Sequence, residues 1–161
     1  MKNKKLVILS MTLCVSLILS YVDNLIPYNF VIPGIKMGLT NIAIVFALYK
    51  FGMKEAVLIS LLRVFIMGVL FNNGLTFLYS LSGAILSLII MIMLKKFNVF
   101  DEYGVSISGA ISHNIGQLIC AYFLLKTNVL IYYLPYLLLS GLLSGLFIGV
   151  LSAVTIKRVN V

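Results

Sequence analysis

The sequence predicts an all-α integral membrane protein with six transmembrane helices, and three observations carry this prediction. Hydrophobic residues make up 62% of the 161 residues, charged residues only 10%, and the mean hydropathy is +1.16; a soluble domain has about 25% charged residues. Six apolar runs of helix length are separated by short breaks rich in Pro, Gly, Asn and charged residues, and most cations stand at the ends of these runs. Helices satisfy their backbone hydrogen bonds within one segment, whereas a barrel would show shorter alternating strands. Helices are therefore expected.

The six runs form one predicted domain that covers residues 1–161. Most of them approach the roughly 20 residues that a helix needs to cross the hydrocarbon. The second run is short, which fits a tilted helix or a locally thin bilayer. The predicted spans are residues 6–22, 37–51, 54–71, 75–94, 105–125 and 130–156.

The positive charges indicate how the chain is oriented. Twelve Lys and Arg residues against four Asp and Glu residues give a formal net charge of +8. Six spans place both termini on one side; nine of the twelve cations fall on that side, two on the other, and one, Arg63, within a span. The positive-inside rule then predicts a multi-pass protein of the cell (cytoplasmic) membrane with both termini in the cytoplasm. Topology thus explains the basic charge, and no nucleic-acid partner is expected. The nine cations are Lys2, Lys4, Lys5, Lys50, Lys54, Lys95, Lys96, Lys157 and Arg158, and the two are Lys36 and Lys126.

The first run follows a lysine-rich start and resembles a signal peptide. The five apolar runs that come after it favour an uncleaved first span instead. Ser10 and Cys14 are four residues apart, and Thr12, Ser16 and Ser20 repeat that spacing. Small residues at this spacing line one side of a helix, where another helix or a partner subunit can pack closely.

Residues 31–52, which read VIPGIKMGLTNIAIVFALYKFG, place a turn, a cation and an amide together at one predicted membrane edge. The prolines of the preceding loop, residues 23–35, exclude a continuous helix there. Because this loop is still apolar, we expect it either to lie against the membrane or to cap a cavity as a lid. Lys36 then lies at the mouth of a site, with Asn41 about one turn further in.

Arg63 is the strongest single indication of a binding site. It lies nine residues beyond Lys54, roughly 13 Å along the helix and near the middle of the membrane. A charge at that depth usually faces a cavity or a partner. No acidic residue of the sequence is predicted to lie beside it, so an anionic ligand could supply the counter-charge. The alternative is that Arg63 reaches the membrane surface or binds backbone carbonyls near Gly68.

His113, Asn114 and Gln117 form a second polar cluster. Their spacings of three and four residues predict that they share one helical face. A satisfied hydrogen bonder between helices is the alternative interpretation of His113. Tyr79 lies at a depth similar to that of Asn41, so the polar groups concentrate in the outer half of the spans. This pattern predicts a ligand pocket that is open to the outside and closed towards the cytoplasm.

Two further patterns concern packing. Gly141, Gly145 and Gly149 form a ridge of small residues on the last span, which predicts close contact with another helix. The motif Ser-x-Ser-Gly-Ala-Ile occurs at residues 80–85 and again at 106–111. Because these two spans run in opposite directions, the repeat fits either an inverted repeat or a coincidence of composition.

The sequence lacks the motifs of known catalytic sites. No Asp-rich motif, Gly-rich nucleotide loop or Walker motif is present. Cys14 and Cys120 both fall within apolar runs and indicate neither a disulfide nor a metal site. We therefore expect a protein that is not an enzyme and that has no cofactor and no metal.

Four blocks of the sequence resemble the Gx transporter family, which is also labelled heptaprenyl diphosphate synthase component I. The blocks are PGIKMGLTNIAIVFALYKFG at 33–52, EAVLISLLRVF at 55–65, LYSLSGAILS at 78–87 and GVSISGAISHNIGQL at 104–118. The resemblance implies a bundle like that of the S components of energy-coupling factor (ECF) transporters. S components dock a transmembrane coupling subunit through an Ala-x-x-x-Ala pattern on the first helix. Its nearest equivalents here are Ser10 with Cys14 and Thr12 with Ser16.

Two functions follow as hypotheses. The first is an S-component-like subunit that takes up a small anionic or amphipathic compound and is energised by partner ATPases. Its ligand-binding residues would be Lys36, Asn41, Arg63, Tyr79, His113, Asn114 and Gln117. The second is a membrane accessory subunit for isoprenoid or quinone (heptaprenyl diphosphate) synthesis or for flavin-linked electron transfer.

Overall fold

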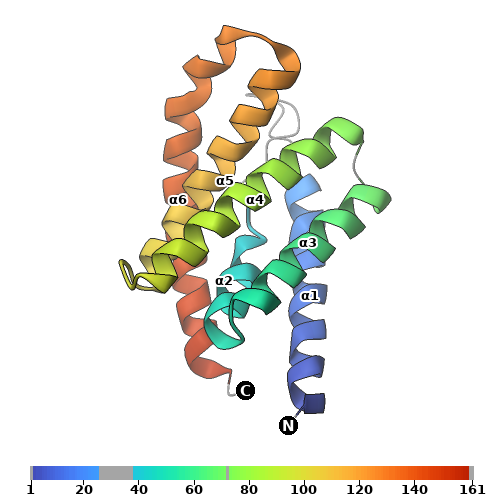
Figure 1. The fold of residues 1–161 in the computed structure, drawn as a ribbon, viewed down its shortest axis with the longest axis vertical. Helices are drawn as coiled ribbons and strands as arrows, with labels where there is room; N and C mark the ends of the chain where they lie inside the picture. The colour runs from blue at the N-terminus through green and yellow to red at the C-terminus, as the bar shows by residue number, and fades with distance from the viewer. Residues whose placement is uncertain (1, 26–37, 72, 160–161) are drawn as a thin grey trace.

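The computed structural model describes residues 2–25, 38–71 and 73–159, and over these residues it is helical, with no strand (Figure 1). Six α-helices correspond to the six apolar runs, and a short 3-10 helix precedes the last of them. The elements are α1 (Lys2–Leu25), α2 (Asn41–Lys50), α3 (Met53–Leu70), α4 (Gly74–Lys96), α5 (Glu102–Leu125), η1 (Asn128–Tyr133) and α6 (Leu134–Arg158).

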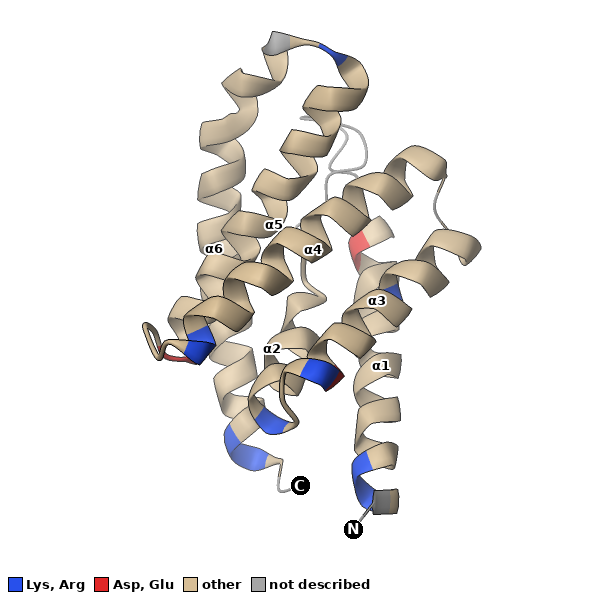
Figure 2. Ribbon diagram, in the orientation of Figure 1, with Lys and Arg blue, Asp and Glu red and all other residues tan. Residues whose placement is uncertain are grey.

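Three segments have the length and composition of membrane spans: Asn3–Leu25, Gly74–Lys96 and Val129–Arg158. Both ends of the chain lie at the same end of the molecule, together with the turn between α2 and α3 (Figure 1). The cations gather towards this end, as Figure 2 shows. We call it the basic end, and its cations are Lys4, Lys5, Lys50, Lys54, Lys95, Lys96, Lys157 and Arg158.

Helix α1 continues further than the sequence predicted. The first span was expected to end at residue 22, but the helix runs to Leu25, so Asp23 and Asn24 belong to its last turn and not to a loop. Thr12, Ser16 and Ser20 are buried against the bundle. Ser10 and Cys14 are exposed on the outer side of the helix. Close packing within this chain therefore uses Thr12, Ser16 and Ser20, while the role predicted for Ser10 and Cys14 in docking a partner stays a prediction.

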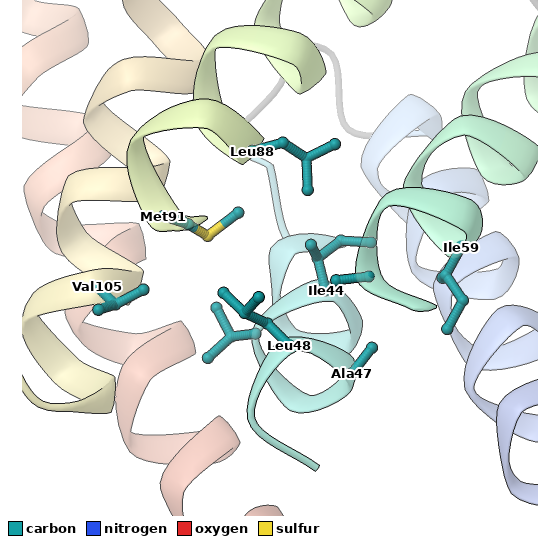
Figure 3. Packing of buried hydrophobic residues seen from close by; sticks show 9 residues of the cluster. Ile44, Ala47, Leu48, Ile59, Leu88, Met91 and Val105 are labelled. Carbon is teal, nitrogen blue, oxygen red and sulfur yellow. The ribbon is translucent and has the colours of Figure 1, made fainter. Parts of the chain in front are cut away.

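Helix α2 is a short central helix. The second span was expected over residues 37–51, but the helix covers only the ten residues Asn41–Lys50, or about 15 Å. Seven of the ten residues are buried, because α2 packs against α1, α3, α5 and α6. Figure 3 shows the core around it, where Ile44 and Leu48 of α2 lie among apolar side chains of α3, α4 and α5.

The glycine ridge of α6, formed by Gly141, Gly145 and Gly149, packs directly on α5. A Cβ atom at Gly145 would lie 2.6 Å from the Cα atom of Ile107, and one at Gly149 would lie 3.2 Å from the Cα atom of Tyr103. Ser106 Oγ also donates a hydrogen bond to the carbonyl oxygen of Gly145 at 2.9 Å. The backbones of α5 and α6 therefore approach too closely to admit a larger residue at position 145.

The repeated Ser-x-Ser-Gly-Ala-Ile motif places one glycine on each side of the α4–α5 contact. A Cβ atom at Gly83 would lie 2.9 Å from the carbonyl oxygen of His113 on α5, and one at Gly109 would lie 2.6 Å from the Sδ atom of Met91 on α4. Ser87 Oγ donates to the carbonyl oxygen of Gly109 at 2.8 Å. Each copy of the motif thus packs one helix of this pair closely on the other.

Lys95 of α4 stabilises the C-terminal end of α2. Its Nζ atom donates to the carbonyl oxygen of Leu48 and lies 4.8 Å from the ring centroid of Tyr49. A cation at a helix C-terminus compensates carbonyl groups that have no partner within the helix. Replacing Lys95 by Met is expected to lower the free energy of unfolding by about 1–2 kcal/mol, since a charged hydrogen bond and a cation–π contact are lost.

Thermal unfolding of the detergent-solubilised protein, followed by circular dichroism, measures this loss. The matched control is Lys96→Met, because Lys96 is the exposed neighbour on the same helix. Equal melting temperatures for the two variants would show that the Lys95 contacts contribute no stability.

Candidate ligand-binding site

One cavity brings together residues from α1, α3, α4, α5 and the segment before α2. Its interior leaves about 20 Å³ for the centres of water molecules, which is room for about one or two waters. The side chains that line it are mostly small and polar, in contrast to the apolar core around α2. The lining residues are Ser20, Asp23, Gly38, Thr40, Arg63, Val64, Met67, Ser80 and His113.

Arg63 lies in this cavity, and its side chain is 6% exposed. Its Nη1 atom donates to the hydroxyl oxygen of Thr40. Its Nε atom has no hydrogen-bond partner among the described residues. The guanidinium therefore keeps donor capacity for a ligand or for water, because buried donors are rarely left without a partner.

Asp23 supplies the counter-charge that the sequence did not predict for Arg63. It lines the same cavity, is 2% exposed, and its negative charge acts favourably on the guanidinium. The backbone N–H of Gly38 donates to Asp23 Oδ2 at 3.1 Å. The expectation that no carboxylate lies near Arg63 is therefore wrong, because α1 continues through Asp23 and carries it into the bundle. The Asp23–Gly38 and Arg63–Thr40 hydrogen bonds join α1 and α3 to the segment that leads into α2.

A signal for Asp23 was present in the sequence. Thr12, Ser16 and Ser20 recur every four residues, and Asp23 follows three residues after Ser20. Residues three and four apart lie on one face of a helix, and all four side chains are buried. Extending the polar face of α1 by one more turn would have placed Asp23 in the bundle.

His113 lines the same cavity as Arg63, so the two predicted site residues do meet. Glycines leave room for the imidazole on two sides. A Cβ atom at Gly38 would lie 3.6 Å from His113 Cδ2, and one at Gly83 would lie 2.9 Å from His113 Cε1. The segment before α2 and helix α4 thus both approach the ring closely.

The other members of the polar cluster on α5 lie elsewhere. Asn114 Nδ2 donates to the carbonyl oxygen of Leu137 on α6 at 2.9 Å. Gln117 is fully buried and packs on Gly83 of α4. A Cβ atom added at Gly83 would lie 3.0 Å from Gln117 Cγ. The prediction that all three residues share one face is wrong for Asn114, because α5 is sandwiched between α4 and α6 and successive residues turn towards different neighbours.

Two further predicted site residues, Asn41 and Tyr79, do not line the cavity. Asn41 is buried beside the cavity, with its Nδ2 atom 3.4 Å from the Cβ position of Gly38. Tyr79 belongs to an apolar cluster with Ala121, Leu130 and Leu137 and does not line the cavity. Its neighbour Ser80 does, and Ser80 Oγ is buried without a partner among the described residues. Lys36 and residues 26–35 of the expected lid lie outside the described residues.

The cavity is lined by polar groups but, among the described residues, shows no metal-binding arrangement. Within residues 2–25, 38–71 and 73–159, no three His, Cys, Asp or Glu side chains lie together as metal ligands would. The side chains provide a guanidinium, a carboxylate, an imidazole and hydroxyl groups. This set can orient a small polar molecule by charge and hydrogen bonds.

The sequence matches one known protein family over most of its length. The sequence profile of heptaprenyl diphosphate synthase component I matches residues 12–155, which include every residue that lines the cavity. The chain belongs to the heptaprenyl diphosphate synthase component I family. Comparisons with curated proteins and with solved structures found no match. The resemblance to ECF S components stays a prediction. The match confirms the family that the four sequence blocks indicated, by its name of heptaprenyl diphosphate synthase component I.

Proposed function

We propose that this chain is the membrane-embedded, non-catalytic subunit of a prenyl diphosphate synthase, and that a separate catalytic subunit carries out the condensation. Membership of the heptaprenyl diphosphate synthase component I family is the observation that supports this role. The family's name describes one component of an assembly, so the proposal includes a second protein that binds this one.

The acidic residues support the non-catalytic part of the proposal. A site for Mg²⁺ and diphosphate needs carboxylates that are available to the metal, and the sequence has four acidic residues. Asp23 lies in the cavity with Arg63, and Glu55 accepts a hydrogen bond from Lys5 Nζ at 2.5 Å. Only the adjacent Asp101 and Glu102 remain. Metal-dependent prenyl transfer therefore belongs on the partner.

We further propose that the six helices all serve as spans of the cell membrane and that the basic end faces the cytoplasm. The gathering of cations at that end supports this orientation. It would present the cations to a soluble partner subunit. In intact cells, a membrane-impermeant lysine reagent should leave the basic end unmodified until the membrane is opened. Modification in intact cells would show that the basic end faces outward, contrary to the proposal.

The identity of the co-purifying partner tests the proposed role. The tagged chain is cross-linked through lysines in its native membranes, purified in a mild detergent and analysed by mass spectrometry. A prenyl diphosphate synthase is expected, cross-linked to the basic end, and absent from a parallel purification of an unrelated multi-pass protein. A preparation that contains no such synthase would overturn the proposal.

A second role, the binding subunit of an uptake system, is favoured by the polar cavity. A protein that served only as an anchor would have no need for a buried Arg63 beside unsatisfied hydroxyl and guanidinium groups. The same purification separates the two roles, since an uptake subunit would retain a coupling subunit and ATPases instead of a synthase.

A further inference from the structure

We propose that the 3-10 helix η1 and the first turn of α6 lie among the lipid headgroups, at the membrane surface opposite the basic end. The side chains that contact the headgroups are those of Tyr132 and Tyr136. This inference rests on the proposed spanning of the membrane by α5 and α6. It does not depend on the synthase role or on which membrane surface is cytoplasmic.

The length of the last candidate span indicates that part of it lies outside the hydrocarbon. The segment Val129–Arg158 has 30 residues, whereas about 20 residues cross the hydrocarbon. Lys157 and Arg158 stand in its last turn, and charged side chains near a helix end reach towards the membrane surface. Counting about 20 residues back from Lys157 places the opposite boundary near Leu137. The residues before Leu137 therefore lie beyond the hydrocarbon.

The exposed face of α6 changes in character at this boundary. Five exposed apolar residues with spacings of three and four form one stripe along the helix: Leu139, Leu143, Phe147, Val150 and Val154. Tyr136 continues the stripe three residues before its first member and is 68% exposed, and Tyr132 is 79% exposed. Tyrosine is enriched at membrane–water interfaces, because its ring is apolar and its hydroxyl group can reach water. The stripe thus ends in the residue type that marks an interface.

Helix α5 indicates a boundary at the same end of the molecule. Its first residue, Glu102, and its C-cap, Lys126, are 24 positions apart, or about 36 Å along a helix. Both charges can therefore lie outside a hydrocarbon layer of about 30 Å. Tyr122 is exposed one turn before Lys126, and one turn further back Leu118 and Ile119 line an apolar groove between α5 and η1. The surface of α5 thus changes from apolar through aromatic to charged.

The position of the tyrosines favours headgroups over a protein partner. Figure 1 shows η1 and the start of α6, in orange, at the end of the molecule remote from both termini. The soluble partner is proposed to bind at the other end. Tyr136 also continues a stripe that faces lipid if α6 spans the membrane, so the same bilayer is its nearest neighbour.

Single tryptophans measure the depth of this segment. The sequence contains no tryptophan, so each variant has one. Tyr132→Trp, Tyr136→Trp and the control Phe147→Trp, all changes of exposed side chains, are reconstituted in phosphatidylcholine vesicles. Quenching is compared for lipids spin-labelled near the headgroup, for lipids labelled near the chain end, and for iodide in the water. Phe147 is the matched control, because it lies on the same stripe 11 residues beyond Tyr136, roughly 16 Å deeper.

Tyr132→Trp and Tyr136→Trp are expected to be quenched at least about twofold more by the headgroup label than by the chain-end label, and Phe147→Trp should show the reverse. Stronger quenching of Tyr136→Trp by the chain-end label would place this turn in the hydrocarbon, and quenching by iodide alone would place it in water. Shielding from all three quenchers would indicate a protein contact, such as a second copy of the chain. Each of these results would overturn the inference.

The control also separates failure of the inference from failure of the proposed spanning. If Phe147→Trp is quenched by the chain-end label while the tyrosine variants are not at headgroup depth, α6 spans the bilayer and only the inference is wrong. If Phe147→Trp is not quenched by the chain-end label, α6 does not cross the bilayer, and the proposed spanning fails together with the inference.

Discussion

Replacing Arg63 by Ala is expected to destabilise the protein by about 2–4 kcal/mol, because it truncates a long buried side chain and removes a positive charge that acts favourably with the buried Asp23. The change also removes the donor to Thr40 and opens a gap among α1, α3 and the segment before α2. Thermal unfolding in detergent, followed by circular dichroism, measures the loss.

Two further variants interpret this result. Arg158→Ala removes the same side chain from an exposed position at the basic end and should have almost no effect. Asp23→Asn added to Arg63→Ala should recover part of the lost stability, since the buried negative charge that Arg63 compensates in part is then removed as well. Similar melting temperatures for Arg63→Ala and Arg158→Ala would mean that the buried guanidinium of Arg63 contributes no more to stability than an exposed one.

Replacing Gly145 by Ala is expected to destabilise the α5–α6 contact by about 1–3 kcal/mol. The added Cβ atom would lie 2.6 Å from Ile107 Cα and 3.1 Å from Ala110 Cβ. One of these neighbours is backbone, so relief requires the helices to move apart. Helix propensity alone would favour Ala over Gly by about 1 kcal/mol, and the clash must exceed that gain.

The matched control for this substitution is Gly74→Ala. A Cβ atom at Gly74, the first residue of α4, meets nothing within 4 Å. Its melting temperature should stay within about 2 °C of the wild type. If Gly145→Ala were as stable as Gly74→Ala, the close approach of α5 and α6 at this level would be wrong.

The helices could be predicted because their signal is local. Long apolar runs bounded by Gly, Asn and Lys identify helices of the right number and approximate length. The ends were less certain: α1 extends past residue 22, and α2 begins at Asn41 instead of residue 37. Hydropathy averages over many residues, so it does not register the single turn that carries Asp23 into the bundle.

The cavity could be predicted only in part, because it depends on which helices become neighbours. Arg63 and His113 stood out as polar residues within apolar runs, and the structure brings them together. Thr40 and Ser80 carry no comparable signal, since single hydroxyl residues are common in membrane helices. Asn114 is adjacent to His113 in sequence but contacts α6 instead, a difference that only the order of helices around α5 decides.

The position of the short helix α2 has a consequence for how the protein is made. Its backbone relies on residues that the ribosome produces much later: Lys95 binds the carbonyl oxygen of Leu48, and Ser152 Oγ donates to that of Ile42 at 3.5 Å. Until α4 and α6 have emerged, these ten residues lack the neighbours that bury them. The packing around α2 is therefore complete only once α6 has been synthesised.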